Sequence, residues 1–104
     1  MERADFLKQS ASALEHIEEK LADLEHDTLD VDLAADVLTI DFGDGTKFII
    51  NAHSAAGQIW MAANRSAWHF DLVDSRWVAR KTDDELMSTV AREVGAKLGM
   101  DIAL

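Results

Sequence analysis

The spacing of apolar residues changes twice along this chain, and these changes constrain the fold more than any other feature. Over about residues 5–24 apolar side chains recur three and four positions apart, which indicates an amphipathic helix. From Leu29 the spacing falls to two, the repeat of strands with one buried face. After residue 82 the helical spacing returns. The inward helical positions are Leu7, Ser10, Leu14, Ile17, Leu21 and Leu24, then Leu86, Met87, Val90, Ala91, Val94 and Leu98.

The middle of the chain predicts about six strands. Asp44-Gly45 favours a tight hairpin turn, and Asn64-Arg65-Ser66 and Asp74-Ser75 separate later strands. Because nearly every connection is short, we expect an antiparallel meander with both helices on one face. The fold class is therefore α+β. The expected strands cover residues 29–33, 38–42, 46–51, 58–62, 68–73 and 76–78.

The second helix carries signals at both ends. Thr82-Asp83-Asp84-Glu85 matches a capping box, in which the Thr and Glu side chains satisfy free backbone donors at a helix start. Gly99 stands where a left-handed C-terminal cap is expected. The remaining residues, 100–104, alternate at Ile102 and Leu104 and are predicted to fill the groove between the helices.

Length and charge limit the number of domains and the kinds of binding partner that we expect. The 104 residues are enough for one domain, which we assign to 1–104. Twenty acidic residues face ten basic ones, so the net charge is −10, and we expect neither nucleic-acid nor membrane binding. Basic proteins and metal cations are the partners that we expect for a chain with this negative charge. Without cysteine there is no self-ligated iron–sulfur cluster, and without an apolar span or secretory pattern we expect a cytoplasmic protein.

Residues 15–32 are unusually acidic, with one basic residue, Lys20, among them. Around a helix, Glu15, Glu19 and Asp23 lie opposite the apolar stripe, and the following strand should point Asp30 outward. The result is one continuous surface, which we call the acidic ridge. Such a ridge is typical of a solvated helix face or of a weak, exchangeable site for hard cations, and charge pattern alone leaves both open. Its carboxylates are Glu15, Glu18, Glu19, Asp23, Glu25, Asp27, Asp30 and Asp32.

Trp60 is predicted to lie on the open face of the sheet. In Gln58-Ile59-Trp60-Met61, alternate residues point to opposite faces, and the aliphatic pair is the natural core set. A tryptophan displayed beside amide side chains favours recognition of a partner.

No pattern is typical of an active site. Asp41-Phe42-Gly43 spells the metal-binding triplet of kinases, but it leads into a hairpin of a chain that is far too short. Lone histidines such as His53 and His69 are more often surface residues than catalytic bases. We therefore do not expect an enzyme.

Together these segments resemble the frataxin family, in its bacterial form. An acidic helix runs into an acidic strand, followed by Ile50-Asn51, a six-residue spacer and Gln58-Ile59-Trp60. Trp68-His69-Phe70 and Arg76-Trp77-Val78 follow in the family's order. The resemblance implies a two-layer α/β sandwich that acts in iron–sulfur cluster assembly, with weak, exchangeable binding of Fe²⁺ and Fe³⁺ on the ridge. It also implies binding to the cysteine desulfurase and scaffold complex, and at most weak ferroxidase activity.

By position, the resemblance assigns all ridge carboxylates except Glu15 to iron and to a basic patch of the desulfurase. It assigns Asn51, Gln58 and Trp60 to the sheet surface that contacts the assembly complex. His53 stands where many members carry Gln, and His69 where some carry Arg; both are included in the predicted partner surface. An acidic interaction module with incidental metal binding is the alternative function. We expect a monomer and leave open whether iron induces oligomers, and whether the protein accelerates or inhibits cluster synthesis.

Overall fold

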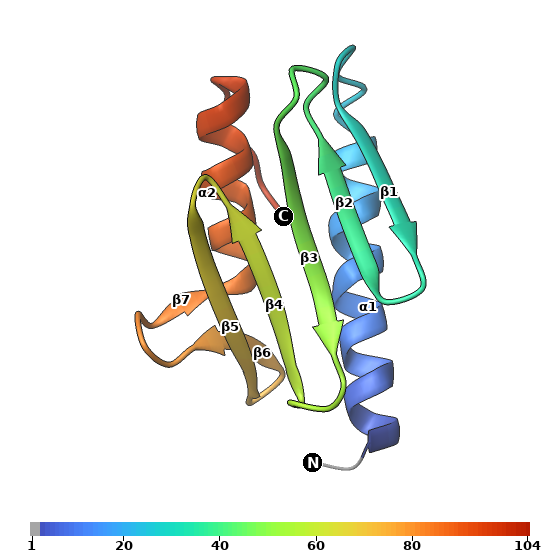
Figure 1. The fold of residues 1–104 in the computed structure, drawn as a ribbon, viewed down its shortest axis with the longest axis vertical. Helices are drawn as coiled ribbons and strands as arrows, with labels where there is room; N and C mark the ends of the chain where they lie inside the picture. Colours follow the sequence, from blue (N-terminus) through green and yellow to red (C-terminus); the bar gives the residue numbers. More distant parts are fainter. Residues whose placement is uncertain (1–2) are drawn as a thin grey trace.

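The computed structural model describes residues 3–104 and shows two helices covering one face of a single antiparallel sheet (Figure 1). Seven strands pair in the order in which they follow along the chain, one more than the sequence predicts. Neither helix within residues 3–104 is long and apolar enough to cross a membrane. The elements are α1 (Arg3–Ala22), β1 (Asp30–Ala34), β2 (Val37–Asp41), β3 (Lys47–His53), β4 (Gln58–Ala63), β5 (Ser66–Val73), β6 (Arg76–Ala79), β7 (Asp84–Glu85) and α2 (Leu86–Leu98).

The core lies between the sheet and the helices. Alternate residues of β2, β3 and β4 point into it, as the spacing of two predicts, and both helices contribute a stripe. A buried aliphatic or aromatic side chain contributes about 1.5–3 kcal/mol relative to exposure, so this layer is the main source of stability. The largest fully buried side chains are Phe48, Phe70, Leu14, Ile17, Leu21, Leu38, Ile40, Ile50, Ile59, Met61, Leu86 and Val90.

The first helix turns a different residue inward than the sequence predicts. Leu7 is 40% exposed, whereas Phe6 is 3% exposed and packs edge-on against Trp77, with ring centroids 5.7 Å apart. At 100° per residue, Phe6 lies about 20° from Ile17 around the helix axis and Leu7 about 80°. The prediction for Leu7 is therefore wrong. The helix also ends at Ala22, before Leu24.

The second helix starts later than predicted. Asp84–Glu85 is extended and pairs with β6, so the helix cannot begin at Thr82. The N-cap is Glu85, whose carboxylate accepts hydrogen bonds from the backbone N–H groups of Met87 (2.9 Å) and Ser88 (3.2 Å). The hydroxyl of Thr82 donates to Asp84 instead, at 2.8 Å. The predicted capping box is wrong.

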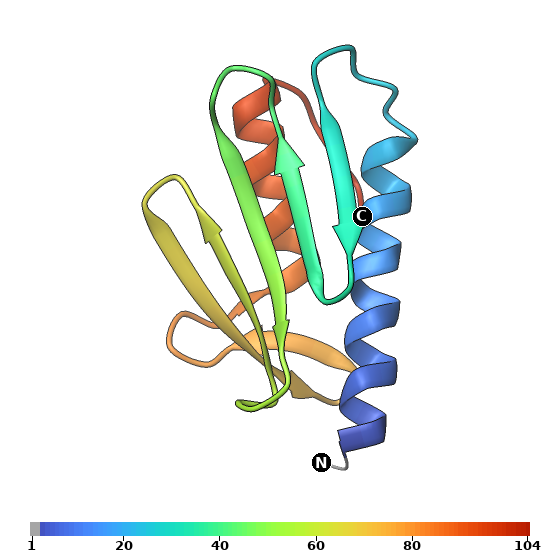
Figure 2. The same cartoon turned by 45° about the vertical axis from the view of Figure 1, so that its right-hand side comes forward.

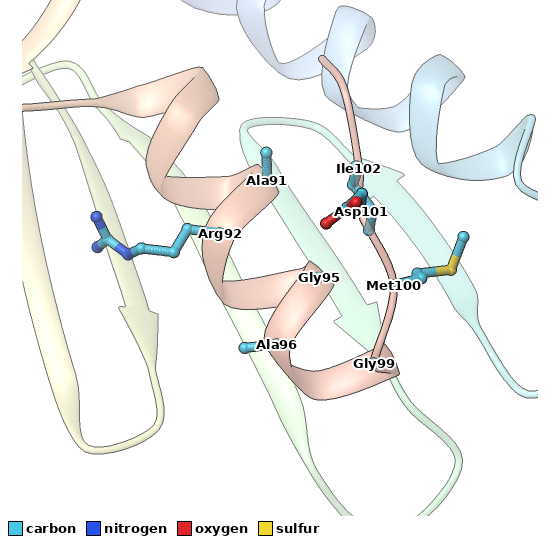
Figure 3. A pocket seen from close by; sticks show the side chains of 8 residues that line it. All are labelled: Ala91, Arg92, Gly95, Ala96, Gly99, Met100, Asp101 and Ile102. Atoms are coloured by element: carbon cyan, nitrogen blue, oxygen red, sulfur yellow. The ribbon is translucent and has the colours of Figure 1, made fainter.

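The C-terminal end confirms the prediction. Gly99 has φ +70° and caps α2, and the tail then runs back between the helices (Figures 1 and 2). Ile102 and Leu104 pack against the core, and the Leu104 carbonyl oxygen lies 3.0 Å from Nε2 of His16 on α1. At Gly95 the tail and α2 come so close that a Cβ atom there would lie 2.7 Å from the Met100 carbonyl oxygen. Figure 3 shows this contact region, beside an open hollow of about 570 Å³.

Candidate metal and partner surfaces

The acidic ridge begins on the solvent side of α1. Glu15, Glu19 and Asp23 are exposed, opposite the buried stripe, and Glu18 is half-buried on its flank. Hydrogen bonds from the N–H of Asp23 to the Glu19 carbonyl (3.0 Å) and from the N–H of Glu25 to the Ala22 carbonyl (3.1 Å) continue the turn past the helix end. The acids of the helix and of its exit therefore follow one another without a break.

A short turn then carries the ridge from α1 to β1. Its shape is fixed around His26, whose Nδ1 accepts a hydrogen bond from the Thr28 N–H (3.4 Å) and whose carbonyl accepts from the Leu29 N–H (3.1 Å). Asp27 is exposed on this turn. In β1 the side chains alternate, so Asp30 and Asp32 are exposed while the residues between them are half-buried. This placement confirms the predicted geometry of the ridge.

The ridge has little compensating positive charge, since Lys20 is the one basic residue among residues 15–32. None of its carboxylates forms an ion pair within residues 3–104, whereas five acids elsewhere do. One of those pairs joins Asp44 to Lys97 at 2.7 Å, and this ammonium group lowers the Asp44 pKa from 3.8 to about 2. The lysines and arginines that form ion pairs are thus engaged by acids outside the ridge, so they do not neutralise the ridge carboxylates directly.

The ridge is not a ready-made metal cage. Within residues 3–104, no three His, Asp or Glu side chains stand close enough together to enclose an ion. The carboxylates are spread along a helix, a turn and a strand, and most are solvated. Such an arrangement suits hard cations held by few protein oxygens and several waters, or a basic protein surface.

The five predicted partner residues come together on the open face of the sheet. In the register, Asn51 lies opposite Trp60 and Trp60 opposite His69, while His53 lies opposite Gln58 in the next row. Their neighbours in sequence point the other way; Ile59 is fully buried. The predicted face of Trp60 is confirmed, because Trp60 is half-buried on the side away from the helices.

Trp60 stands between two imidazole rings. Its ring stacks on His53 with centroids 3.9 Å apart and on His69 with centroids 4.4 Å apart, at interplanar angles of 16° and 17°. The indole N–H donates to Oε1 of Gln58 at 2.8 Å, and the Gln58 amide in turn donates to Asp71 at 3.1 Å. The indole is therefore fixed in orientation between the two imidazole rings.

Sequence reasoning missed the stacking and the role of Asp71. Both depend on strand register, which the Asn64-Arg65 turn sets, since residues 63 and 66 pair across it. Counting outward from that turn places His69 opposite Trp60. The position of the turn could therefore have predicted the pairing of Trp60 with His69, whereas the residue types alone could not.

Comparisons with known proteins agree with this architecture. The family model described as a Frataxin-like domain matches residues 1–100. Two similar proteins are named "Iron-sulfur cluster assembly protein CyaY". That of Neisseria meningitidis is 30% identical over 95% of this chain and 92% of its own length, and that of Ralstonia nicotianae is 32% identical over 97% and 92%.

Two solved structures share the fold. A frataxin from Psychromonas ingrahamii superposes with a TM-score of 0.91 over 99% of this chain and 97% of its own, at 23% identity. The trimeric yeast frataxin from Saccharomyces cerevisiae gives a TM-score of 0.75 over 85% and 77%, at 26% identity. The family match covers nearly the whole sequence, and the helices, sheet and ridge are all present. The chain therefore belongs to the frataxin family, in its bacterial form.

Proposed function

We propose that this protein serves iron–sulfur cluster assembly in the cytoplasm, as a monomer without enzymatic activity of its own. It binds Fe²⁺ or Fe³⁺ weakly on the acidic ridge and modulates a cysteine desulfurase and scaffold complex, as iron donor or regulator. The names of its relatives support the process. The observation that carries the proposal is that an unpaired ridge ends at the edge of a sheet that displays Trp60.

The ridge supplies long-range attraction. Its carboxylates stand on α1, on the following turn and on β1, where Asp30 and Asp32 occupy the edge strand of the sheet. Exposed charges of one sign steer a partner of the opposite sign, and the effect falls with a screening length of about 8 Å at physiological salt. The same oxygens are ligands that iron accepts in a labile site.

The sheet supplies a fixed contact. Trp60 is held by two stacked rings and one hydrogen bond, so little side-chain freedom remains to be lost when a partner binds. Beside it, Ala62 and Ala67 are small, and a shallow hollow of about 230 Å³ lies over them. A rigid aromatic edge next to a hollow is typical of an anchoring point in a protein interface.

A pure interaction module is the second candidate, because the ridge holds no ready-made metal cage within residues 3–104. In that case the acids recognise a basic partner and metal binding is incidental. The two functions differ in one respect. Only the first requires iron to change cluster synthesis or desulfurase binding.

The test is affinity for the cysteine desulfurase across a salt series, with Fe²⁺ and with a chelator. We expect wild-type affinity to fall as salt rises, and Glu18→Gln/Glu19→Gln to bind more weakly with a flatter salt dependence. Asp74→Asn/Asp83→Asn is the matched control: it removes the same charge far from β1, and Asn tolerates the positive φ of 49° and 62° at these positions.

Two outcomes would change the proposal. If wild-type affinity is flat with salt and the ridge variant binds equally well, the ridge is not part of the interface. If binding and cluster synthesis are the same with Fe²⁺ and with chelator, the interaction module replaces the iron-dependent function.

A further inference from the structure

The sheet has a notch on the side of β5 that faces away from β4. Strand β5 pairs with β4 over residues 66–71, but β6 pairs only with its last three residues, 71–73. The chain then turns at residues 80–83 towards β7, so β6 and the turn diverge from the first half of β5 (Figure 1). The result is a hollow of about 370 Å³, which we call the β5 notch.

Two basic side chains, Arg80 and Lys81, stand on the wall of this notch. Arg80, Lys81 and His69 line it, together with the Gln58 amide and the ring of Trp68. One carboxylate, that of Asp71, lines the notch, and each of its oxygens already accepts a hydrogen bond: one from the Gln58 amide (3.1 Å) and one from Nε of Arg80 (3.2 Å). A second carboxylate, that of Asp84, lies beside the notch, where it accepts from Nε1 of Trp68 (3.0 Å) and pairs with Arg92 (3.3 Å). The notch therefore presents two cationic groups, of which Lys81 forms no ion pair among residues 3–104, in a chain with a net charge of −10.

Donor groups remain free for a ligand. Arg80 reaches Asp71 through Nε, which leaves its two terminal amino groups without a partner in the described part of the chain, and its side chain is 73% exposed. Lys81 forms no ion pair or side-chain hydrogen bond within residues 3–104. His69 stacks on Trp60 by its face, so its ring nitrogens lie free at the ring edge. Terminal guanidinium and ammonium groups together are the donors that carboxylates and phosphates accept best.

We propose that the β5 notch binds a small molecule that carries at least two anionic groups, carboxylates or phosphates. Two groups are required because Arg80 and Lys81 follow one another on the turn and each presents a separate cation. The volume is near the lower end of the range for small-molecule pockets, about 300–1,000 Å³. This site lies across the sheet from β1 and is separate from the acidic ridge. It shares Gln58 and His69 with the proposed partner surface, and binding of a small anion there goes beyond the proposed function.

The test is titration of the ¹⁵N-labelled protein with citrate, inorganic phosphate and acetate, followed by amide chemical shifts and by the indole N–H of Trp60. Citrate should give saturable shifts at residues 69, 71 and 80–82, and through the stacked His69 ring at Trp60. Acetate, with one carboxylate, should bind at least several-fold more weakly. Inorganic phosphate, which is a single anionic group, should likewise bind more weakly than citrate.

Arg80→Gln/Lys81→Gln should weaken citrate binding by about tenfold, since each exposed charge contributes about two- to fivefold. Lys47→Gln is the matched control; it removes a lysine from the same open face, near the other edge of the sheet, and should leave binding unchanged. Three results would overturn the proposal: no saturable shifts at these residues, equal affinity in the double variant, or acetate binding as tightly as citrate. None of them bears on iron binding by the ridge.

Discussion

Gly95 gives the sharpest test of how the tail is packed, because two effects of opposite sign meet there. Alanine is favoured over glycine in a helix interior by about 0.8–1.0 kcal/mol, so Gly95→Ala should stabilise α2 considered alone. In the structure, however, the added Cβ would lie 2.7 Å from the Met100 carbonyl oxygen. That oxygen is backbone and cannot rotate away, so the tail must move.

The loss of stability can be estimated from the hydrogen bonds and the packing of the C-terminal tail. The Gly95 carbonyl accepts from the N–H groups of Gly99 (2.8 Å) and Met100 (3.0 Å), and Ile102 packs against the core beyond them. Overpacking costs about 1–3 kcal/mol, and a weakened hydrogen bond adds about 0.5–1.5 kcal/mol. After subtracting the helix gain, we expect Gly95→Ala to lower the free energy of unfolding by about 0.5–3.7 kcal/mol. Each kcal/mol lowers the melting temperature of a domain of this size by roughly 4–8 °C.

Denaturant and thermal unfolding of five proteins test this reasoning: wild type, Gly95→Ala, Ala96→Gly, and the chain without residues 100–104 with and without Gly95→Ala. Ala96→Gly, on the exposed side of α2, measures the helix-propensity effect alone and should cost about 1 kcal/mol. In a chain that lacks residues 100–104, Gly95→Ala should change sign and become stabilising by up to about 1 kcal/mol. Equal destabilisation in the full and shortened chains would refute the proposed contact with the tail.

Three further predictions concern the two faces of β4, the pH dependence and the start of α2. Ile59→Ala should lower the free energy of unfolding by about 2–5 kcal/mol, whereas Trp60→Ala should cost less and mainly weaken partner binding; thermal melts in the reverse order would invert the face assignment. Because the pKa of Asp44 is lowered from 3.8 to about 2, its stabilising pair is complete above pH 3.8 and lost as the pH falls through 2. Asp44→Asn should therefore be less stable than wild type at neutral pH and equal to it in strong acid, by denaturant titration at each pH. Glu85→Ala should cost about 0.5–2 kcal/mol as a lost N-cap and Thr82→Ala less; a larger loss for Thr82 would restore the capping box.

The order of elements could be predicted from the sequence because burial enforces a spacing of two in strands and of three to four in helices. β7 was missed because two residues are too few to show alternation. For the same reason the start of α2 was misplaced: Thr82 to Glu85 satisfies the pattern of a capping box, but pairing of residues 84–85 with β6 overrides it. Leu7 was misassigned because a single apolar residue near a helix end fits two neighbouring faces.

The candidate surfaces differ in how much of each can be predicted from the sequence. The ridge could be predicted because its exposure depends only on helix angle and strand alternation, which are local. The stacked rings around Trp60 depend on pairing between three strands, and the β5 notch depends on where β6 leaves β5. Such features arise from register and divergence of the sheet. Apart from the Asn64-Arg65 turn, which sets the register of β4 and β5, no local pattern encodes them.

Anaerobic calorimetric titration with Fe²⁺ tests the central claim, that the ridge is the iron-binding surface. Glu18→Gln/Glu19→Gln/Asp23→Asn should weaken iron binding while the melting temperature stays equal or rises, because repulsion between like charges on α1 is relieved. A control variant, Asp74→Asn/Asp83→Asn/Asp101→Asn, removes the same charge elsewhere and should bind iron like wild type. Unchanged iron affinity in the ridge variant, or an equal loss in the control, would contradict the account.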